Sequence, residues 1–361
     1  MRHAMVMAGG SGTRLWPVSR GGLPKQLVPL IGGKSLLRIA CDRLEGVVDV
    51  DHRWICTGER FRSQVRDAVP SMADERIIGE PCGRDTLNAV GLTAAVLAAS
   101  DPDAIFAVLT ADHLIEPQSV FADRLDAGFR LVEEDPNRFV TFAIRPTHPA
   151  TGFGYVERGE AIAGHDGCFI ADRFVEKPDL ETAEAYLEAG TFGWNSGMFV
   201  FHARTVLETI GRFEPATLEG LERIAAAWDG PSRQETIEAV YPDLKRISVD
   251  YGLMEPVSRD DRITIGVVPM DLSWIDVGSW PSLGETIEPD ASGNRIAPGT
   301  GSTDLGSKGL LVFSTDPDHR ICTIGCDDLV VVHTADATLV CKASEAQRVK
   351  EIAGLVPEDH R

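Results

Sequence analysis

Apolar residues over most of the chain follow one of two spacings. Short continuous apolar runs are typical of buried strands, and apolar residues that recur every three or four positions indicate helices. The runs predict strands at 4–8, 54–57, 77–78, 105–109, 139–144, 151–157, 170–176, 198–201 and 263–268. The helical spacing predicts helices at 36–44, 61–69, 88–99, 120–134, 180–189 and over much of 204–241. Strands and helices in this alternation predict a three-layer α/β fold with a mixed, mainly parallel sheet.

The pattern changes beyond residue 285. Short β-rich runs at 310–313, 320–324, 329–333 and 338–341 are separated by turns rich in glycine and aspartate, and no helix is predicted before 344–352. Strands joined without helices are typical of a small coiled β module. We therefore predict an α/β domain at 1–285 and a β-helix-like domain at 286–361.

The stretch that follows the first apolar run carries the clearest chemistry. From Met7 to Leu27 it reads MAGGSGTRLWPVSRGGLPKQL, with five glycines, two arginines and one lysine. Glycine lets backbone N–H groups approach an anion closely, because no Cβ stands in the way and positive φ is allowed. The stretch therefore predicts a phosphate-binding loop, and a tight turn without a ligand is the alternative. Its spacing matches neither the dinucleotide fingerprint nor the P-loop.

The distribution of charge narrows the choice of ligand. The first 41 residues contain six lysines and arginines and no carboxylate, whereas the whole chain has a formal net charge of −20. A local basic segment in an acidic protein favours a small polyanion, because a nucleic-acid surface needs a broad basic face. We therefore expect no nucleic-acid partner. An acidic chain repels phosphorylated substrates in general, so we expect a divalent cation to assist the basic loop.

Two aspartates stand where such a cation would bind. Asp112 follows the strand predicted at 105–109, and ligands of open α/β sheets collect at the carboxyl ends of strands. Asp276 lies between apolar neighbours in a later segment. Together they would complete a Mg²⁺ site, since this ion takes one or two carboxylates plus substrate phosphates and water. A helix cap or a turn explains either aspartate taken singly.

Amide and carboxylate groups near strands also favour a sugar ligand. Glu157 ends a glycine-punctuated strand, and Asn195 with Ser196 precedes another strand. Sugar hydroxyls need both hydrogen-bond donors and acceptors, and aromatic residues lie beside these positions. For each residue alone, a surface turn is the alternative explanation.

Composition indicates a reducing compartment. The seven cysteines are scattered and odd in number, which argues for reduced thiols in the cytoplasm. Cys322 and Cys326 lack the second pair or the histidine cluster of a metal site. No apolar run approaches the roughly 20 residues of a membrane helix, so no membrane partner is expected.

Several ordered motifs resemble one enzyme family. The loop from Gly9 to Leu27 resembles the signature of the sugar nucleotidyltransferases, in the version found in mannose-1-phosphate guanylyltransferases. The resemblance continues in TADH, TGFGYVE, FVEKP, WNSGMFVF, ISVDYGLME and WIDVGSW, which begin at Thr110, Thr151, Phe174, Trp194, Ile247 and Trp274. The segment 327–341 is similar to the family's C-terminal module. The resemblance thus covers nearly the whole chain.

The resemblance implies a role for each matching residue. The residues that would bind the nucleotide and its phosphates are Gly9, Gly10, Gly12, Thr13, Arg14, Lys25 and Arg84. The residues that would bind the sugar phosphate are Gly154, Glu157, Lys177 and Asn195. Asp112 and Asp276 would bind the catalytic Mg²⁺, and Arg14, Lys25 and Asp112 would be the catalytic residues.

The resemblance also implies a fold, a reaction and an assembly. The family combines a Rossmann-like nucleotidyltransferase domain with a left-handed β-helix that often forms dimer contacts, which implies a homodimer. The reaction makes GDP-mannose and pyrophosphate from GTP and mannose 1-phosphate by Mg²⁺-dependent in-line transfer.

One segment departs from the family pattern. The family usually reads Gly-Arg-Asn-Thr-Ala-Pro near the nucleobase, whereas this chain has Asp85 and Asn88 in place of the asparagine and the proline. The choice of nucleoside triphosphate and of sugar 1-phosphate therefore stays open. A catalytically silent homologue that binds a GDP-sugar and regulates a partner is a further alternative.

Overall fold

The chain, described by a computed structural model over residues 1–10 and 12–361, forms two compact units. The sheet unit comprises the segments Met1–Gly9, Ala40–Thr110 and Ile115–Trp274. The solenoid unit comprises Gly10–Ile39, Ala111–Leu114 and Ile275–Arg361. Most of the predicted phosphate-binding loop therefore belongs to the same unit as the C-terminal residues. The predicted sequence boundary after residue 285 stays a prediction.

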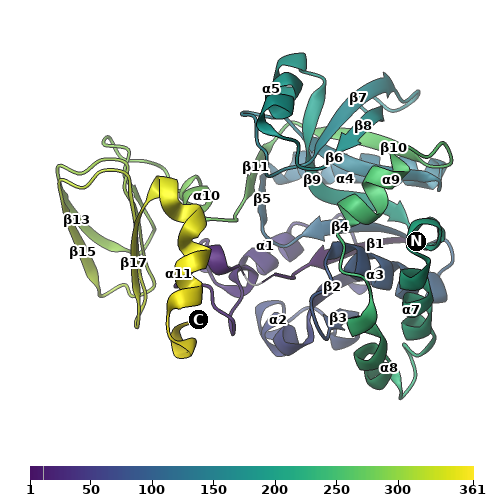
Figure 1. Ribbon diagram of the computed structural model, residues 1–361, viewed down its shortest axis with the longest axis horizontal. Coiled ribbons are helices and arrows are strands. Elements are labelled where there is room, and N and C mark those ends of the chain that lie inside the picture. Colours follow the sequence, from purple (N-terminus) through teal and green to yellow (C-terminus); the bar gives the residue numbers. More distant parts are fainter. Residues whose placement is uncertain (11) are drawn as a thin grey trace. The chain divides into compact units, whose positions relative to one another are not determined.

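The sheet unit is organised around one mixed sheet, with the strand order β3-β2-β1-β4-β9-β6-β10-β8-β7 (Figure 1). Its strands are β1 (Arg2–Met7), β2 (Arg53–Gly58), β3 (Ile77–Glu80), β4 (Ile105–Thr110), β6 (Arg138–Ile144), β7 (Tyr155–Ala161), β8 (Phe169–Val175), β9 (Phe192–His202) and β10 (Thr264–Met270). β1 is parallel to β2 and β4, as β2 is to β3 and β6 to β10. β9 runs antiparallel to β4, β6 and β7, which confirms a mixed sheet.

The helices of the sheet unit follow the predicted helical spacing. They are α2 (Arg62–Ala68), α3 (Thr86–Ser100), α4 (Gln118–Glu134), α5 (Leu180–Ala189), α6 (Ala203–Phe213), α7 (Pro215–Ala226), α8 (Arg233–Val240), α9 (Glu255–Val257) and the π-helix η7 (Asp250–Met254). α1 (Leu36–Asp42) passes from one unit into the other. Within residues 1–10 and 12–361, no helix is long and apolar enough to cross a membrane.

Helices cover both faces of the sheet, as the α/β pattern predicts. α3, α6 and α7 share one hydrophobic cluster with Phe199 and Phe201 of β9. α4 lies on the opposite face, where a side chain at Gly128 would meet Phe142 and Val200. Val200 stands between Phe199 and Phe201, and successive residues of a strand point to opposite faces. The predicted three-layer arrangement is therefore confirmed.

Two predicted site residues fall differently along their strands. β7 begins at Tyr155, so Glu157 occupies its third position rather than its end. Asn195 lies inside β9 rather than ahead of it. The segment around Asn195 has the composition of a turn, but β9 has pairing partners on both sides there, Ile144 and Ala143 of β6 and Tyr155 of β7. Tertiary pairing therefore overrides the local preference.

The solenoid unit contains the coiled β module that the C-terminal pattern predicts. Its strands are β12 (Arg295–Ile296), β13 (Gly301–Leu305), β14 (Leu311–Ser314), β15 (Arg320–Ile324), β16 (Leu329–His333) and β17 (Thr338–Lys342). β12, β14 and β16 stack in parallel in one sheet, and β13 and β15 in another. β17 closes the first sheet in the antiparallel direction. The short β12 and the largely polar β13 escaped prediction, because neither has a continuous apolar run.

Short helices complete the solenoid unit, and a small sheet is formed by two strands that pass from one unit into the other. The helices are η1 (Thr13–Leu15), η2 (Lys25–Leu27), α10 (Trp280–Gly284), η8 (Ala343–Arg348) and α11 (Val349–Leu355). β5 (His113–Glu116) pairs with β11 (Ser273–Asp276) in a two-stranded sheet.

Hydrophobic burial joins the loop to the rest of the solenoid unit. Leu15 and Trp16 of the loop belong to the same core cluster as Trp280, Phe313 and Val349. Trp280 is fully buried, and its indole Nε1 donates to the carbonyl oxygen of Trp16 at 3.0 Å. Each buried apolar side chain stabilises such a core by roughly 1.5–3 kcal/mol, so burial of Leu15 and Trp16 anchors the loop to the core.

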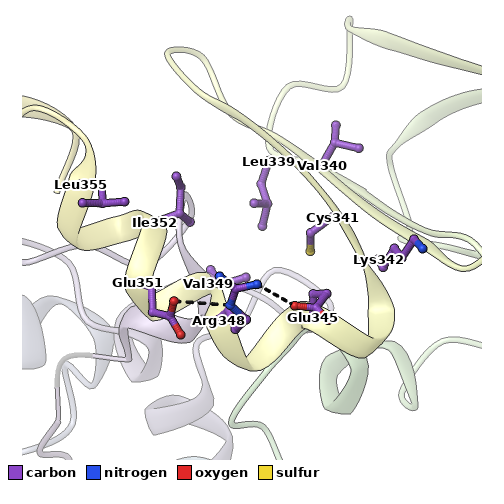
Figure 2. Close-up of a pocket in the computed structure, with 10 residues that line it drawn as sticks. All are labelled: Leu339, Val340, Cys341, Lys342, Glu345, Arg348, Val349, Glu351, Ile352 and Leu355. Carbon is purple, nitrogen blue, oxygen red and sulfur yellow. Dashed lines mark hydrogen bonds and ion pairs between the residues drawn. The ribbon is translucent and has the colours of Figure 1, made fainter.

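A groove of about 360 Å³ lies along β17, η8 and α11 (Figure 2). Its apolar lining includes Ile352 and Leu355, and Leu355 is 79% exposed. Arg348 pairs with Glu345 at 3.0 Å and with Glu351 at 3.3 Å on its rim. These pairs are exposed and stabilise little. The groove is therefore an open surface feature of the C-terminal helix.

We expect Phe201→Ala to destabilise the protein by roughly 3–5 kcal/mol, because it leaves a cavity between aromatic rings. Phe201 is fully buried and its ring centroid lies 4.8 Å from that of Phe139 and 5.4 Å from that of Phe199. Denaturant unfolding followed by fluorescence measures the change. Leu180→Ala, at a side chain that is 54% exposed, is the control and should shift the free energy of unfolding by less than about 0.5 kcal/mol.

Candidate functional site

The glycine loop has the backbone conformation that an anion-binding loop requires. Gly10 and Gly12 have φ angles of +95° and +61°, in the left-handed region that favours glycine. A Cβ at Gly12 would lie 2.6 Å from the Cβ and Cγ of Lys25, closer than carbon atoms approach. Gly10 is exposed, and so is Thr13 at the start of η1. The loop thus has exposed residues at Gly10 and Thr13, and Gly12 packs against the aliphatic part of the Lys25 side chain.

Lys25 is the most constrained charge of this unit. The residue is only 8% exposed, and its Nζ lies 2.8 Å from the Oδ2 of Asp112. The same Nζ donates to the carbonyl oxygen of Val277 at 3.0 Å. A buried ammonium group is costly unless it is paired and hydrogen-bonded, and these two partners supply both. Lys25 therefore joins the loop, the segment after β4 and the end of β11.

Asp112 is held as a carboxylate. Burial acts to raise the pKa of Asp112, and the positive charge of Lys25, with a smaller effect of His113, acts to lower it. The lowering prevails, so the pKa of Asp112 lies below its usual value. The backbone also holds the residue, because Val277 N donates to the carbonyl oxygen of Asp112 at 3.0 Å.

Asp276 brings a second carboxylate to Asp112. One ligand atom from each of Asp112, His113 and Asp276 lies within 4.8 Å of the others. Mg²⁺ prefers carboxylate oxygens and water, so the two aspartates fit this ion and the imidazole is not needed. Lys25 already neutralises one oxygen of Asp112. A cation would therefore be held weakly by the two aspartates alone and more strongly when a phosphate adds negative charge.

Arg14 lies beside this carboxylate pair. Its NH1 donates to Oε1 of Gln347 in η8 at 3.1 Å. A Cβ at Gly278 would lie 3.2 Å from NH2 of Arg14 and 3.4 Å from Oδ1 of Asp276. Gly278 thus leaves room for the guanidinium next to Asp276. The solenoid unit brings together Gly10, Gly12, Thr13, Arg14, Lys25, Asp112 and Asp276 of the predicted residues.

The C-terminal residues form hydrogen bonds and an ion pair with the loop, and the sequence did not predict these contacts. Trp16 donates through Nε1 to the carbonyl oxygen of His360 at 2.7 Å, and Gly21 N donates to that of Arg361 at 3.2 Å. Arg20 forms an ion pair with Asp336 at 2.5 Å. Contacts across more than 300 residues carry no sequence signal of their own. The conformation of the loop therefore depends on the C-terminal segment.

A second group of predicted residues gathers in the sheet unit around Asn195, which is 7% exposed. Its Oδ1 accepts from Thr141 Oγ1 at 2.9 Å and from Gly197 N at 3.2 Å. These donors set the orientation of the amide, whose Nδ2 donates to Oδ1 of Asp250 at 2.9 Å. Asn195 therefore presents a fixed donor to a carboxyl group at the start of the π-helix η7.

Lys177 lies in the turn after β8, beside the same group. Its φ of +46° is unusual for a residue with a side chain, and its Nζ pairs with Oε1 of Glu176 at 2.5 Å. Partial burial acts to lower the pKa of Lys177, but the hydrogen bond and charge of Glu176 and the charge of Asp250 raise it above its usual value. A Cβ at Gly154 would lie 2.5 Å from Oε2 of Glu176 and 3.3 Å from the Cβ of Asn195. Gly154, Lys177 and Asn195 thus surround one small site.

Glu157 does not join this site. It pairs with Arg173 at 3.2 Å and accepts from Thr191 Oγ1 at 3.3 Å. Glu157 and Tyr155 are two residues apart on β7, so their side chains point to the same face of the sheet. Gly154 comes one residue before Tyr155. A sugar contact by Glu157 stays a prediction.

Gly9 and Arg84 complete the predicted residues of the sheet unit. Gly9 is exposed at the end of its first segment. The Nε of Arg84 is buried and has no hydrogen-bond partner among the residues that the structure describes. The Arg84 carbonyl oxygen accepts from Asn88 Nδ2 at 2.7 Å, and the same Nδ2 donates to Lys245 O at 2.8 Å. Asn88, which replaces the family's proline, thus has a structural role at the start of α3.

The structure adds Glu176 and Asp250 to the predicted residues. Burial and, after it, the negative charge of Glu176 raise the pKa of Asp250 to about 7, against the lowering effects of Lys177 and Asn195. Both carboxylates stand inside motifs that resemble the family, FVEKP and ISVDYGLME. The motifs marked the segments, but only the fold brings their carboxyl groups to one lysine.

Two family models match the chain. The family model described as nucleotidyl transferase matches residues 3–292. A second model, described as the MannoseP isomerase/GMP-like beta-helix domain, matches residues 304–354. The second match covers most of the coiled strands of the solenoid unit and confirms that they form a β-helix domain.

Relatives match almost the whole chain. A mannose-1-phosphate guanylyltransferase of Klebsiella pneumoniae is 36% identical over 362 residues, covering 99% of this chain and 74% of the relative. One of Escherichia coli K12 is 37% identical over 366 residues, with the same coverage. A crystal structure described as a mannose-1-phosphate geranyltransferase from Thermus thermophilus superposes with a TM-score of 0.86 at 31% identity, covering 98% of both chains.

We expect Gly12→Ala to destabilise the protein by about 1–3 kcal/mol, because alanine would be strained at positive φ. Its methyl group would also displace the Lys25 side chain, so the affinity for inorganic pyrophosphate should fall at least tenfold by calorimetry. The control is Gly354→Ala, in α11 of the same unit, where φ is not positive and a Cβ meets no described atom within 4 Å. Equal affinity of Gly12→Ala and wild type would contradict the role of Gly12.

Proposed function

Because the chain belongs to the nucleotidyltransferase family, among the mannose-1-phosphate guanylyltransferases, we propose that it makes GDP-mannose and pyrophosphate from GTP and mannose 1-phosphate. The observation that carries the proposal is the buried Lys25 beneath the glycine loop, paired with Asp112 next to Asp276. A site for a triphosphate needs fixed positive charge, open backbone N–H groups and carboxylates for a cation, and this group has all three.

The solenoid unit supplies the residues proposed for the triphosphate. Gly10, Gly12 and Thr13 would offer the backbone of the loop, together with Gly9 of the sheet unit. Arg14 and Lys25 would neutralise the charge that grows on the leaving pyrophosphate. Arg84 would bind the nucleotide, and its buried Nε is a donor that a ligand could satisfy. The family resemblance implies these assignments, and the charge of Arg14, Lys25 and Arg84 supports them; Arg84 belongs to the sheet unit.

Asp112 and Asp276 are the proposed ligands of Mg²⁺. When bound, this ion would neutralise phosphate charge and orient the reacting groups. Because Lys25 competes for Asp112, the nucleotide and the cation should bind together, each strengthening the affinity for the other. The role of Lys25 is then to hold Asp112 as a carboxylate until the nucleotide arrives.

The sheet unit supplies the residues proposed for mannose 1-phosphate. Lys177 would bind the phosphate, since it is half-exposed and positively charged. Asn195 and the backbone at Gly154 would bind the sugar hydroxyls, with Glu176 as an acceptor beside them. The fixed amide of Asn195 favours a hydroxyl partner of defined geometry.

The reaction requires no general base. A phosphate oxygen of mannose 1-phosphate, already ionised at neutral pH, would attack the α-phosphorus of GTP. One P–O bond forms as the bond between the α-phosphorus and the bridging oxygen breaks, and the electron pair leaves with pyrophosphate. Bringing two anions together is then the main barrier, which positioning and charge neutralisation lower.

The experiment that tests this function is an assay of pyrophosphate release over a grid of nucleoside triphosphates and sugar 1-phosphates. We expect GTP with mannose 1-phosphate to give the highest kcat/KM. Another preferred pair would replace the proposed substrates and keep the reaction. Absence of Mg²⁺-dependent turnover with every pair, together with tight binding of GDP-mannose, would favour a regulatory homologue.

We expect Lys25→Ala to lower turnover by roughly 10²–10³-fold, because it removes the ion-pair partner of Asp112 and the positive charge proposed to neutralise the pyrophosphate. Steady-state pyrophosphate release measures the loss, and circular dichroism checks that the fold persists. Lys350→Ala, at an exposed residue of α11, is the matched control and should retain wild-type turnover. Near-normal turnover of Lys25→Ala would refute the proposed catalytic role of Lys25.

We also propose a homodimer, which the family resemblance implies, in the cytoplasm, which the scattered cysteines favour. Exposed apolar side chains of the β-helix strands support the dimer, since Leu305 is 68% and Ile324 73% exposed and the two are register partners. Such a pair favours an interface between copies. Light scattering should therefore give twice the chain mass of 39.1 kDa, and a monomer mass at micromolar concentration would refute the dimer.

A further inference from the structure

Two carboxyl groups lie near one lysine in the sheet unit. A Cβ at Gly154 would lie 2.5 Å from Oε2 of Glu176 and 3.5 Å from Nδ2 of Asn195, the amide that donates to Asp250. Lys177 Nζ pairs with Oε1 of Glu176, whose side chain is only 6% exposed. Asp250 interacts with both residues. Its charge raises the pKa of Lys177, and the charge of Glu176 raises the pKa of Asp250. The triad therefore carries one negative charge more than its lysine neutralises when both carboxyl groups are ionised. The solenoid unit differs, because its Lys25 has Asp112 as its direct ion-pair partner.

The surroundings of Asp250 leave this imbalance uncorrected. β9 contributes the neutral amide of Asn195, and Tyr251 follows on η7 itself. α3, α6 and α9 also pack against η7. The charged groups of α6 and α9 are exposed or engaged elsewhere, since Arg204 and Glu208 are exposed, Arg212 pairs with Asp260 and Glu255 pairs with Arg259. Asp85, which precedes α3, caps that helix at Thr86 N.

We propose that Asp250 is a positioning residue that takes up a proton when a sugar phosphate draws Lys177 away from Glu176. Binding of the sugar phosphate therefore weakens as the pH rises above neutrality. The inference rests on the proposed function, in which Lys177 binds the phosphate of mannose 1-phosphate. Binding of the sugar phosphate is then coupled to the uptake of one proton, and Asp250 is the group that takes it up.

The proton balance follows from the geometry. Lys177 keeps its three protons and moves its ion pair from the Glu176 carboxylate to the phosphate. The negative charge of Glu176 then acts on Asp250 without the compensating charge of Lys177 on Glu176, and the bound phosphate adds negative charge nearby. A proton from solvent bonds to Oδ2 of Asp250, while Oδ1 keeps its hydrogen bond from Asn195 Nδ2 at 2.9 Å. No bond to a heavy atom forms or breaks in this step.

The sign of the pH dependence follows from linkage. In the free protein the pKa of Asp250 is about 7, and loss of the lysine charge moves it higher in the complex. Between these two values the complex holds more protons than the free protein. The KM for mannose 1-phosphate should then rise with pH, by up to about tenfold per pH unit for one proton. Above about pH 7 the phosphate of the substrate is itself fully ionised, since its second pKa is roughly 6.

The test compares wild type with Asp250→Asn from pH 7 to 9 at saturating GTP. Asparagine mimics the protonated carboxyl group, because its Oδ1 can still accept from Asn195 and its NH₂ replaces the hydroxyl. We expect the KM of this variant for mannose 1-phosphate to be flat and, at pH 9, lower than that of wild type. Damage to the structure would raise the KM instead. The KM for GTP should be the same in both proteins.

Asp261→Asn is the matched control, because Asp261 is an exposed aspartate of the same unit, and it should follow the wild-type pH profile. A wild-type KM that is flat over this range would overturn the proposal, and so would an Asp250→Asn profile that still rises. Absence of turnover in wild type at every pH would instead refute the proposed function. The two failures are therefore distinguishable.

A binding measurement tests the proton directly and needs no turnover. Mannose 1-phosphate is titrated into the wild-type protein at pH 8 in two buffers of different ionisation enthalpy. The difference in heat counts the protons taken up on binding. We expect uptake of a substantial fraction of one proton by wild type and none by Asp250→Asn. Binding to wild type without proton uptake would overturn the proposal, even if the variant failed to fold.

Discussion

The pairing of the buried Lys25 with Asp112 is the interaction on which the solenoid unit's candidate site depends. An ammonium group at 8% exposure is stable only with close acceptors, and the Asp112 carboxylate and the Val277 carbonyl group provide them. The three residues come from three separate segments of the solenoid unit, so one ion pair and one hydrogen bond of Lys25 hold the loop, Asp112 and Val277 together. Gly12 is required at the contact because a side chain there would collide with the lysine.

The two lysines of the candidate sites illustrate opposite uses of charge. Lys25 is buried with one aspartate as its ion-pair partner, which keeps that carboxyl group ionised and fixed. Lys177 is half-exposed and pairs directly with Glu176, so a change of partner would have a small desolvation cost. A rigid charge suits a developing pyrophosphate, which benefits from preorganised donors. A mobile charge suits a substrate that must enter and leave.

The C-terminal part of the chain contacts the side chains of the glycine loop. Gln347 accepts from Arg14, Asp336 pairs with Arg20, and the His360 carbonyl group accepts from Trp16. The shared core around Trp280 adds apolar burial to these polar contacts. In a chain of net charge −20, such contacts hold the basic side chains in place near the site. The C-terminal residues of the solenoid unit thus help to fix the conformation of the glycine loop.

The sequence by itself determined the α/β and β-helix architecture, the glycine loop and the two aspartates, because periodicity and residue spacing are local properties. It also marked Gly154, Lys177 and Asn195 through ordered motifs. Only the tertiary structure showed that Glu157 pairs with Arg173 and that Asn195 donates to Asp250. Strand register and long-range packing decide which side chains face one another, and no local pattern encodes either. The protonation of Asp250 depends on burial and on neighbours distant in sequence, so it too was decided by the fold.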